Sequence, residues 1–252
     1  MARLSTYDRK VRIFNHFTSG VTSLVGIAGK GKTFTGVAIC YEVRELFGMK
    51  VISTTHLKPD FGPYEFFDVN DFVKSLKFAS QKFKAKELQE DDEASLVVMK
   101  SALKLLQDNK GGKVIDFEDS IIFFDEAYQF MDSRNSNSKM NKLFTDFVSM
   151  IRHYRSAAVV TSPTQDMLDK RVRAQIVRTG TARKDFKNPK NPRIRAVIND
   201  MPTMRKLRLN MPVSKYGNMY DHEERVPIRS TTLDIARSQI CLLYTSPSPR
   251  DS

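Results

Sequence analysis

The sequence predicts an α/β fold, in which helices flank a mainly parallel sheet and a basic, β-rich extension follows. Three observations predict it. Short, continuous apolar segments alternate with amphipathic ones, which is typical of buried parallel strands connected by helices. A glycine-rich loop joins the first apolar segment to the first helical one. Three segments with polar faces then follow one another beyond residue 174.

The elements are expected in the following order. The predicted strands are 21–25, 51–55, 120–125 and 157–161, and the predicted helices are 33–47, 71–83, 91–107 and 139–154. Residues 56–64 are rich in turn formers, and the last three strands are expected at 175–180, 192–199 and 206–212. We expect the core of the domain to span residues 1–180 and a basic β-rich extension of the same domain to span residues 181–240.

Residues 26–33 match the phosphate-binding loop pattern G-x-x-x-x-G-K-[ST] at every fixed position. Its glycines let successive backbone N–H groups point at a phosphate, and the following helix adds a partial positive charge. Lys32 would reach the β- and γ-phosphates as a catalytic residue, and the Thr33 hydroxyl would bind Mg²⁺. The alternative is a chance Gly/Lys-rich turn. The predicted nucleotide-binding residues are Gly26, Ile27, Ala28, Gly29, Lys30, Gly31, Lys32, Thr33 and Phe34.

Residues 121–126 (IIFFDE) form an apolar strand that ends in two acids. A P-loop enzyme holds Mg²⁺ with an aspartate from the neighbouring strand, and this role falls to Asp125 together with Thr33. Glu126 would polarise the water that attacks the γ-phosphate, as the catalytic base. After the 157–161 strand, Gln165 could contact the γ-phosphate or orient the attacking water. The alternative is that Gln165 is an ordinary polar residue of a turn.

The positive charge is concentrated in the second half of the chain. Residues 1–133 carry 18 Lys/Arg and 19 Asp/Glu, whereas residues 134–240 carry 22 Lys/Arg and 9 Asp/Glu. A solvated basic surface is one explanation. We favour contact with a polyanion, whose backbone phosphates Lys and Arg neutralise without reading sequence.

Other features limit the class of protein. No apolar run reaches the length of a membrane span, and residues 1–12 lack a signal-peptide apolar region, so we expect a soluble intracellular chain. The two cysteines and four histidines show no disulfide or metal-ligand spacing. Residues 241–252 resemble the translation of a transposon-type sequencing adapter, and we expect the native sequence to be truncated near Ile240; a genuine Ser/Pro-rich tail is the alternative.

Taken together, these motifs resemble the FtsK/HerA superfamily of DNA-pumping ATPases. The chain is similar to genome-packaging ATPases of archaeal and related viruses and to zonula occludens toxin-like assembly ATPases of filamentous phages. The resemblance covers about residues 20–175 and, more loosely, 220–223. Besides the phosphate loop, it rests on residues 125–127, the helix end at 153–155, and Gln165 followed by residues 169–173.

The resemblance implies a RecA-like ATPase that uses ATP and Mg²⁺ in a homo-oligomeric ring, commonly a hexamer. It implies ATP bound between subunits, Gln165 as a sensor-like residue, and an arginine finger that enters from the neighbouring subunit. Arg155 and Arg173 are the catalytic candidates for the finger. Arg152, Arg171 and, more weakly, Arg134 are the alternatives.

The function that the resemblance implies is a DNA-translocating motor that packages a viral genome into the capsid. Its partners would be the backbone of double-stranded DNA and a capsid or portal-type viral protein. It would act in the cytoplasm of the infected host cell, or remain with the virion. One alternative is a toxin-like ATPase that extrudes phages, and such proteins usually carry a transmembrane segment. An alternative of another class is a switch or scaffold that binds NTP without pumping. A small-molecule kinase gives no account of the basic half.

Overall fold

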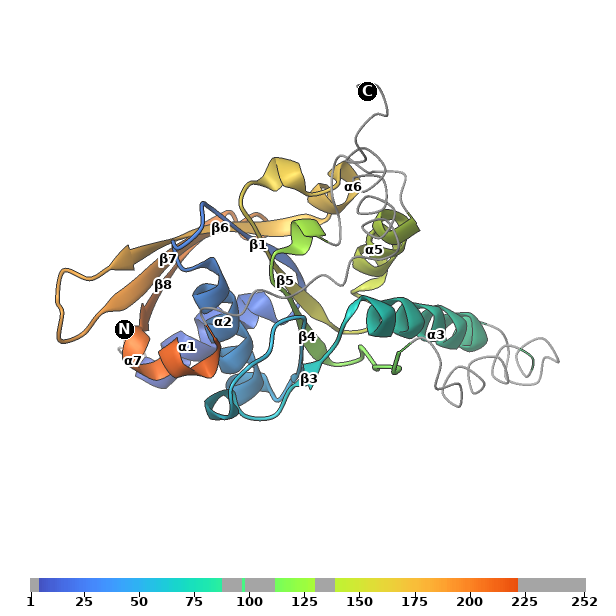
Figure 1. Cartoon of the computed structure of the whole chain (residues 1–252), viewed down its shortest axis with the longest axis horizontal. Coiled ribbons are helices and arrows are strands. Elements are labelled where there is room, and N and C mark those ends of the chain that lie inside the picture. The colour runs from blue at the N-terminus through green and yellow to red at the C-terminus, as the bar shows by residue number, and fades with distance from the viewer. Residues whose placement is uncertain (1–4, 88–96, 98–111, 130–138, 222–252) are drawn as a thin grey trace, which may run out of the picture.

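Eight strands form one sheet in the order β3-β2-β4-β5-β1-β6-β7-β8 (Figure 1). The structure is a computed structural model, and it describes residues 5–87, 97, 112–129 and 139–221. The strands are β1 (Gly20–Val25), β2 (Lys50–Ser53), β3 (Glu65–Phe66), β4 (Ser120–Phe124), β5 (Ala157–Ser162), β6 (Ile176–Asp185), β7 (Arg193–Asp200) and β8 (Arg205–Pro212). All pairings from β3 to β6 are parallel, and β7 pairs antiparallel with both β6 and β8. The predicted fold class is confirmed.

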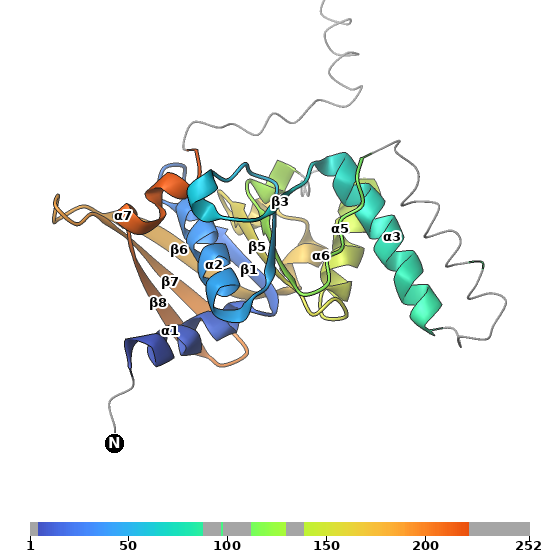
Figure 2. The ribbon, with the colours of Figure 1, turned by 90° about the horizontal axis from the view of Figure 1, so that it is seen from below.

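Helices cover the sheet on two sides (Figures 1 and 2). The α-helices are α1 (Thr6–Phe14), α2 (Lys32–Phe47), α3 (Val69–Glu87), α5 (Lys139–Met150), α6 (Lys170–Arg173) and α7 (Val213–Tyr216). Short 3₁₀ turns are η1 (Asn15–Phe17), η2 (Pro59–Phe61), η3 (Ala127–Gln129), η5 (Gln165–Met167) and η6 (Gly217–Met219). One apolar core joins the sheet to α1, α2 and α7, and a second joins it to α3, α5 and α6.

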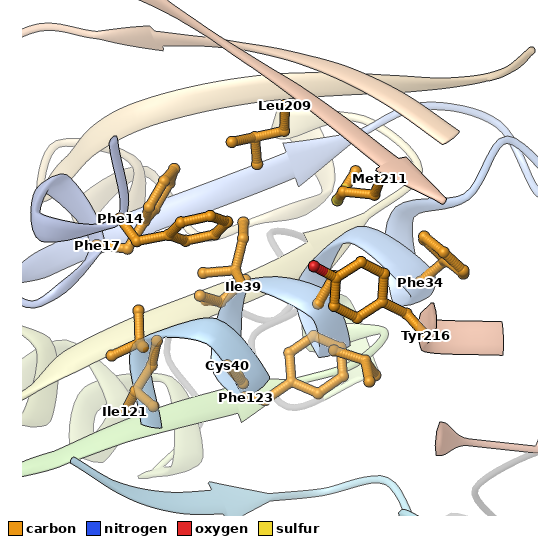
Figure 3. Close-up of a cluster of buried hydrophobic side chains, with 14 of the residues drawn as sticks. Phe14, Phe17, Phe34, Ile39, Cys40, Ile121, Phe123, Leu209, Met211 and Tyr216 are labelled. Atoms are coloured by element: carbon orange, nitrogen blue, oxygen red, sulfur yellow. The ribbon is translucent and has the colours of Figure 1, made fainter. Parts of the chain in front are cut away.

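The first core packs around α2, which follows the phosphate loop (Figure 3). Ile39 and Cys40 of this helix are fully buried, between Phe123 of β4 on one side and Leu209 and Met211 of β8 on the other. The helix therefore connects the parallel part of the sheet to the antiparallel β6–β8 part. Burying these side chains stabilises α2, whose first turn follows the phosphate loop.

Most predicted strands and helices are present within a few residues of their expected bounds. The helix expected at 139–154 ends at Met150, because the chain turns through residues 151–155 to enter β5. The helix expected at 91–107 lies outside the described residues except for position 97, and the tail at 241–252 lies outside them entirely. The strand β6 crosses residue 180, where the extension was expected to begin.

Two features differ from the sequence-based expectation. The strand that ends in Asp125 is not the neighbour of β1, because β5 lies between β4 and β1. The helix α1 was not predicted, although Ser5 and Asp8 form a capping box at its start. Within the described part of the chain, none of the helices has the length and apolar character needed to cross a membrane.

Candidate nucleotide-binding site

The phosphate loop of residues 26–31 joins the carboxyl end of β1 to the amino end of α2. Gly29 and Gly31 have φ angles of +74° and +97°, in the region that strains any residue with a side chain. Space is also limited at Gly31, where a Cβ would lie 3.0 Å from Cγ2 of Ile194 on β7. Residues 27–30 are exposed. The loop is therefore open to a ligand, tightly curled, and placed at a helix N-terminus that favours anions.

Both ends of the loop are held by hydrogen bonds. The Gly26 N–H lies 3.3 Å and 3.1 Å from the carbonyl oxygens of Ser162 and Pro163, at the end of β5. The Lys32 ammonium donates to the Ile27 carbonyl over 3.3 Å, so its head lies over the loop. Partial burial lowers the pKa of Lys32, and the negative charges of Asp125 and Glu126 act in the opposite direction. A bound phosphate would add the anionic partner that a partly buried ammonium needs.

Asp125 lies at the centre of the site, and three threonines surround it. The Thr33 hydroxyl is 3.0 Å from both carboxylate oxygens, and the Thr161 hydroxyl donates to Oδ1 over 2.6 Å. The Asp125 N–H donates to the Thr54 hydroxyl over 3.0 Å. Burial raises the pKa of Asp125, although the bonds from Thr161 and Thr33 and the charge of Lys32 oppose it. A carboxylate in this position has too little compensating positive charge, and a cation would supply it.

The predicted Mg²⁺ ligands therefore lie together. Thr33 and Asp125 present hydroxyl and carboxylate oxygens, which are the hard donors that Mg²⁺ prefers. In the described part of the chain, no group of three or more His, Cys, Asp or Glu could hold a metal by itself. The donor set fits an ion that shares its coordination with substrate phosphates and water.

Thr54 and Thr161 were not singled out as site residues by the sequence analysis. Thr54 directly follows β2, in the segment VISTT. Thr161 is the last residue but one of β5, in the segment AAVVT. Thr161 also accepts a hydrogen bond from the Glu126 N–H over 2.8 Å. A hydroxyl at the carboxyl end of each parallel strand is the signal that could have identified them, since those ends share one edge of the sheet.

Glu126 adopts the left-handed backbone conformation, with a φ of +49°, immediately after Asp125. For a residue other than glycine this conformation costs about 1 kcal/mol, and such strain is concentrated at functional sites. The turn takes the Glu126 side chain, which is exposed, out of the line of the strand. Exposure beside the phosphate loop is compatible with the role of a base that contacts water.

Gln165 lies in η5, three residues beyond the end of β5. Its side-chain amide donates to the Thr179 hydroxyl on β6 over 2.8 Å. The amide thus connects the segment after β5 to β6, on the far side of β1, the strand that leads into the phosphate loop. Its contact with a γ-phosphate stays a prediction.

The arginine candidates lie at different places. Arg155 pairs with Asp119 over 2.6 Å at the amino edge of the sheet, opposite the phosphate loop, and Arg173 pairs with Asp166 over 2.6 Å. Arg171 pairs with the buried Asp169 over 3.1 Å. Arg152 is exposed on the turn after α5, and Arg134 lies outside the described residues. An arginine finger acts on the neighbouring subunit, so its identity stays a prediction.

Phe34 is the one predicted nucleotide-binding residue whose side chain is buried in the core. Its ring makes edge contacts with Tyr216 and Tyr220, with centroids 5.9 Å and 6.4 Å away. Burial raises the pKa of Tyr220, and the Asp125 charge adds to this effect. These aromatic residues pack the first turn of α2 against the segment that follows β8.

Part of this site lies in a region that matches a known protein family. A family model described as Zonular occludens toxin (Zot) matches residues 68–187, which include Asp125, Glu126 and Gln165. No curated protein sequence matches the chain.

Many solved structures are similar to this one, including the three that follow. The N-terminal domain of zonular occludens toxin from Neisseria meningitidis is 14% identical, with a TM-score of 0.46 over 81% of this chain and 99% of that one. The genome packaging NTPase B204 from Sulfolobus turreted icosahedral virus 2, in complex with ATP-gammaS, is 13% identical, with a TM-score of 0.42 over 76% and 97%. A KaiC-like protein from the archaeon Pyrococcus horikoshii is 11% identical, with a TM-score of 0.37 over 77% and 84%.

The phosphate loop, the partly buried Asp125 that faces Thr33, and the mainly parallel sheet are the parts of a nucleoside triphosphatase. The chain is therefore a P-loop NTPase, similar over residues 68–187 to the zonular occludens toxin family.

Proposed function

We propose that this chain is an Mg²⁺-dependent ATPase that moves double-stranded DNA and packages a viral genome into a capsid. The observation that carries the proposal is the contact of Thr33 with Asp125, because it joins the phosphate loop to the acidic strand end. The basic second half of the chain, with 22 Lys/Arg and 9 Asp/Glu over residues 134–240, supports a polyanionic partner.

Each site residue has a defined role in this proposal. The backbone N–H groups of the loop and Lys32 hold the β- and γ-phosphates, and Thr33 and Asp125 hold Mg²⁺. The bound ion neutralises the charge that develops on the phosphate oxygens. Glu126 accepts a proton from the attacking water, and Gln165 orients that water or the γ-phosphate.

The working form in this proposal is a ring of identical subunits, a hexamer, in the cytoplasm of the infected host. ATP binds between subunits, and an arginine from the neighbour stabilises the transition state. Residues 1–180 form the core, and residues 181–240 form its basic extension. A capsid or portal-type viral protein receives the DNA.

A second candidate function is supported by the match to the Zot family model over residues 68–187. In this alternative the same ATPase drives the extrusion of phages and uses the same site chemistry. The two functions differ in the substrate that is moved. Turnover that rises with double-stranded DNA favours the packaging motor, and turnover indifferent to DNA favours the extrusion ATPase or a non-translocating switch.

The decisive experiment compares ATP turnover with and without double-stranded DNA in the wild type and in Glu126→Gln. Loss of the general base should lower turnover by about 10²-fold or more, while nucleotide binding persists. Glu65→Gln is the matched control, because Glu65 is an exposed carboxylate on β3, separated from β4 by β2. Equal turnover in Glu126→Gln and the wild type would refute the assignment of the base.

A further inference from the structure

The three strands β6, β7 and β8 have one buried and one exposed face. On β7, Ile194, Ala196 and Ile198 are buried against the first core, whereas Arg195 and Val197 between them, and Asn199 after them, are exposed. Because side chains alternate along a strand, the residues of β6 and β8 that pair with Arg195, Val197 and Asn199 lie on the same face as these three. In Figure 1, α1, α2 and α7 lie on the other side of these strands. We call this exposed side the open face.

The open face is strongly basic. Cross-strand pairing places the Arg183, Arg195 and Asn210 backbones side by side, and likewise Thr181, Val197 and Arg208. The ionisable side chains on this face are Arg183, Arg193, Arg195, Lys206 and Arg208, with Asp185 as the one acid among the described residues. Asp185 pairs with Arg195 over 2.6 Å, so most of the positive charge remains available to a ligand.

Folding alone does not account for this arrangement. Arg183 and Arg195 are direct cross-strand neighbours, and like charges in such positions destabilise a sheet. A bound anion would relieve that repulsion. Among the described residues, Val197, which is 42% exposed, is the large apolar residue at the centre of the face. The centre of a protein–protein interface is usually apolar and depleted of charged residues, and a single valine among charged residues does not provide such a centre.

The size of the open face fits a polymer better than a single phosphate group. From Arg193 to Asn199 the strand β7 rises by about 20 Å, and three strands are about 10 Å wide. A DNA duplex carries one negative charge per about 1.7 Å of its axis, so a 20 Å length carries about twelve charges. About half of these charges, roughly six, would face the sheet, where they would meet five cations, one of them paired with Asp185.

The open face is also connected to the nucleotide site. Ile194, on the buried side of β7, packs against Gly31 of the phosphate loop. The next residue, Arg195, is on the open face. Thr179, which is paired with Asn199, accepts the hydrogen bond from Gln165. A ligand on this face would therefore lie one strand thickness from the loop that holds ATP.

We propose that the open face of β6, β7 and β8 binds the backbone of double-stranded DNA without reading its sequence. This inference rests on the proposed function and assigns the DNA contact to one surface. Arg183 and Arg208 contribute charge from the two outer strands of the face, and Arg195 lies between them.

The test measures the affinity of the full-length chain for a short labelled DNA duplex between about 50 and 200 mM salt. Arg183→Gln/Arg208→Gln should reduce the slope of log K against log salt by about 1.8, and the affinity at 0.1 M salt by about 60-fold, as expected for two lost phosphate contacts. Arg183→Lys/Arg208→Lys should retain most of the affinity. The matched control is Arg9→Gln/Arg12→Gln, which removes the same charge from exposed positions of α1, on the other side of the sheet.

The possible results separate the two proposals. If the wild type binds no duplex at about 50 mM salt, both the motor and the DNA-binding face are wrong. If the wild type binds duplex, equal losses of affinity in Arg183→Gln/Arg208→Gln and in the α1 control would refute DNA binding by the open face. No loss in Arg183→Gln/Arg208→Gln would refute it as well, and either result would leave the proposed motor function standing. Sedimentation that shows loss of self-association in Arg183→Gln/Arg208→Gln, with DNA affinity unchanged, would make the face a subunit contact. Polyglutamate that competes as well as DNA would indicate an acidic protein partner instead.

Discussion

Replacing Gly36 with alanine tests how closely α2 must approach β4 for the site to form. Gly36 lies one turn after the start of α2, against the ring of Phe123. A Cβ at this position would lie 2.7 Å from Cζ and 3.1 Å from Cδ2 of that ring, and closer still to Cε2. Phe123 is fully buried and precedes Asp125 by two residues, so its ring cannot move without disturbing the site (Figure 3).

Two opposing effects set the magnitude. Alanine is about 1 kcal/mol better than glycine inside a helix. Overpacking a core typically costs about 1–3 kcal/mol, and a contact this short with a buried ring belongs at the upper end. Gly36→Ala should therefore lower the free energy of unfolding by about 1–2 kcal/mol. Displacement of β4 should also separate Asp125 from Thr33 and weaken Mg²⁺-dependent nucleotide binding.

The assay is urea unfolding of Gly36→Ala in the wild-type background and in a Phe123→Leu background. The smaller leucine removes the ring, so alanine should then be neutral or stabilising by up to about 1 kcal/mol. An unchanged or higher urea midpoint for Gly36→Ala alone would refute the reasoning. The same cost in both backgrounds would show that Phe123 is not its cause.

Three further predictions concern single side chains. Burial raises the pKa of Asp125, so its charged form destabilises the folded chain, and Asp125→Asn should raise the melting temperature without nucleotide. The same change should abolish the further rise in melting temperature caused by Mg²⁺ and an ATP analogue. A lower melting temperature without nucleotide would contradict this. Burial alone would raise the pKa of Glu42, but hydrogen bonds from Lys10, Lys215 and Tyr216 lower it overall, so Glu42→Gln should cost about 2 kcal/mol near pH 7. Urea unfolding should show that this difference shrinks as the pH falls below about 4.3, the ordinary glutamate pKa, where Glu42 of the unfolded chain takes up a proton while the folded chain resists it; a difference that grows in acid would be inconsistent. Thr179→Val removes the acceptor for Gln165 and should reduce DNA stimulation of ATP turnover about fivefold, the effect of one net hydrogen bond; full stimulation would exclude a role for this contact.

The local parts of the site could be predicted from the sequence because each depends on adjacent residues. The curl of the phosphate loop needs glycine at positions such as 29 and 31, and the short run IIFFD, in a chain that also has a phosphate loop, favours a buried strand that ends in an acid. These signals specify what each segment forms. They also point to Thr33 and Asp125 as the Mg²⁺ ligands. In the structure their side chains lie 3.0 Å apart, and their role in holding Mg²⁺ stays a prediction.

The order of the strands could not be predicted in the same way, because it depends on pairing between segments far apart in the chain. Insertion of β5 between β1 and β4 brings Thr161 to Asp125, 36 residues away in sequence. The buried Glu42 is a similar case, since its cations Lys10 and Lys215 come from opposite ends of the described chain. A charged residue inside the apolar stripe of a helix indicates that it must be paired with an opposite charge when buried, but the sequence does not indicate which residue provides that charge.

The antiparallel strands are part of the nucleotide site and not a separate appendage. Ile194 packs against Gly31 on one side of β7, and Arg195 faces the opposite side because adjacent strand residues alternate. On the neighbouring strand, Thr179 holds Gln165, which follows the carbonyls that anchor the loop. A change in the loop on binding ATP that shifts β7 must therefore shift the open face as well. Since coupling between two sites is reciprocal, whatever factor nucleotide imposes on DNA affinity, DNA must impose on nucleotide affinity. The proposed motor requires such coupling, and β7 connects the phosphate loop to the open face.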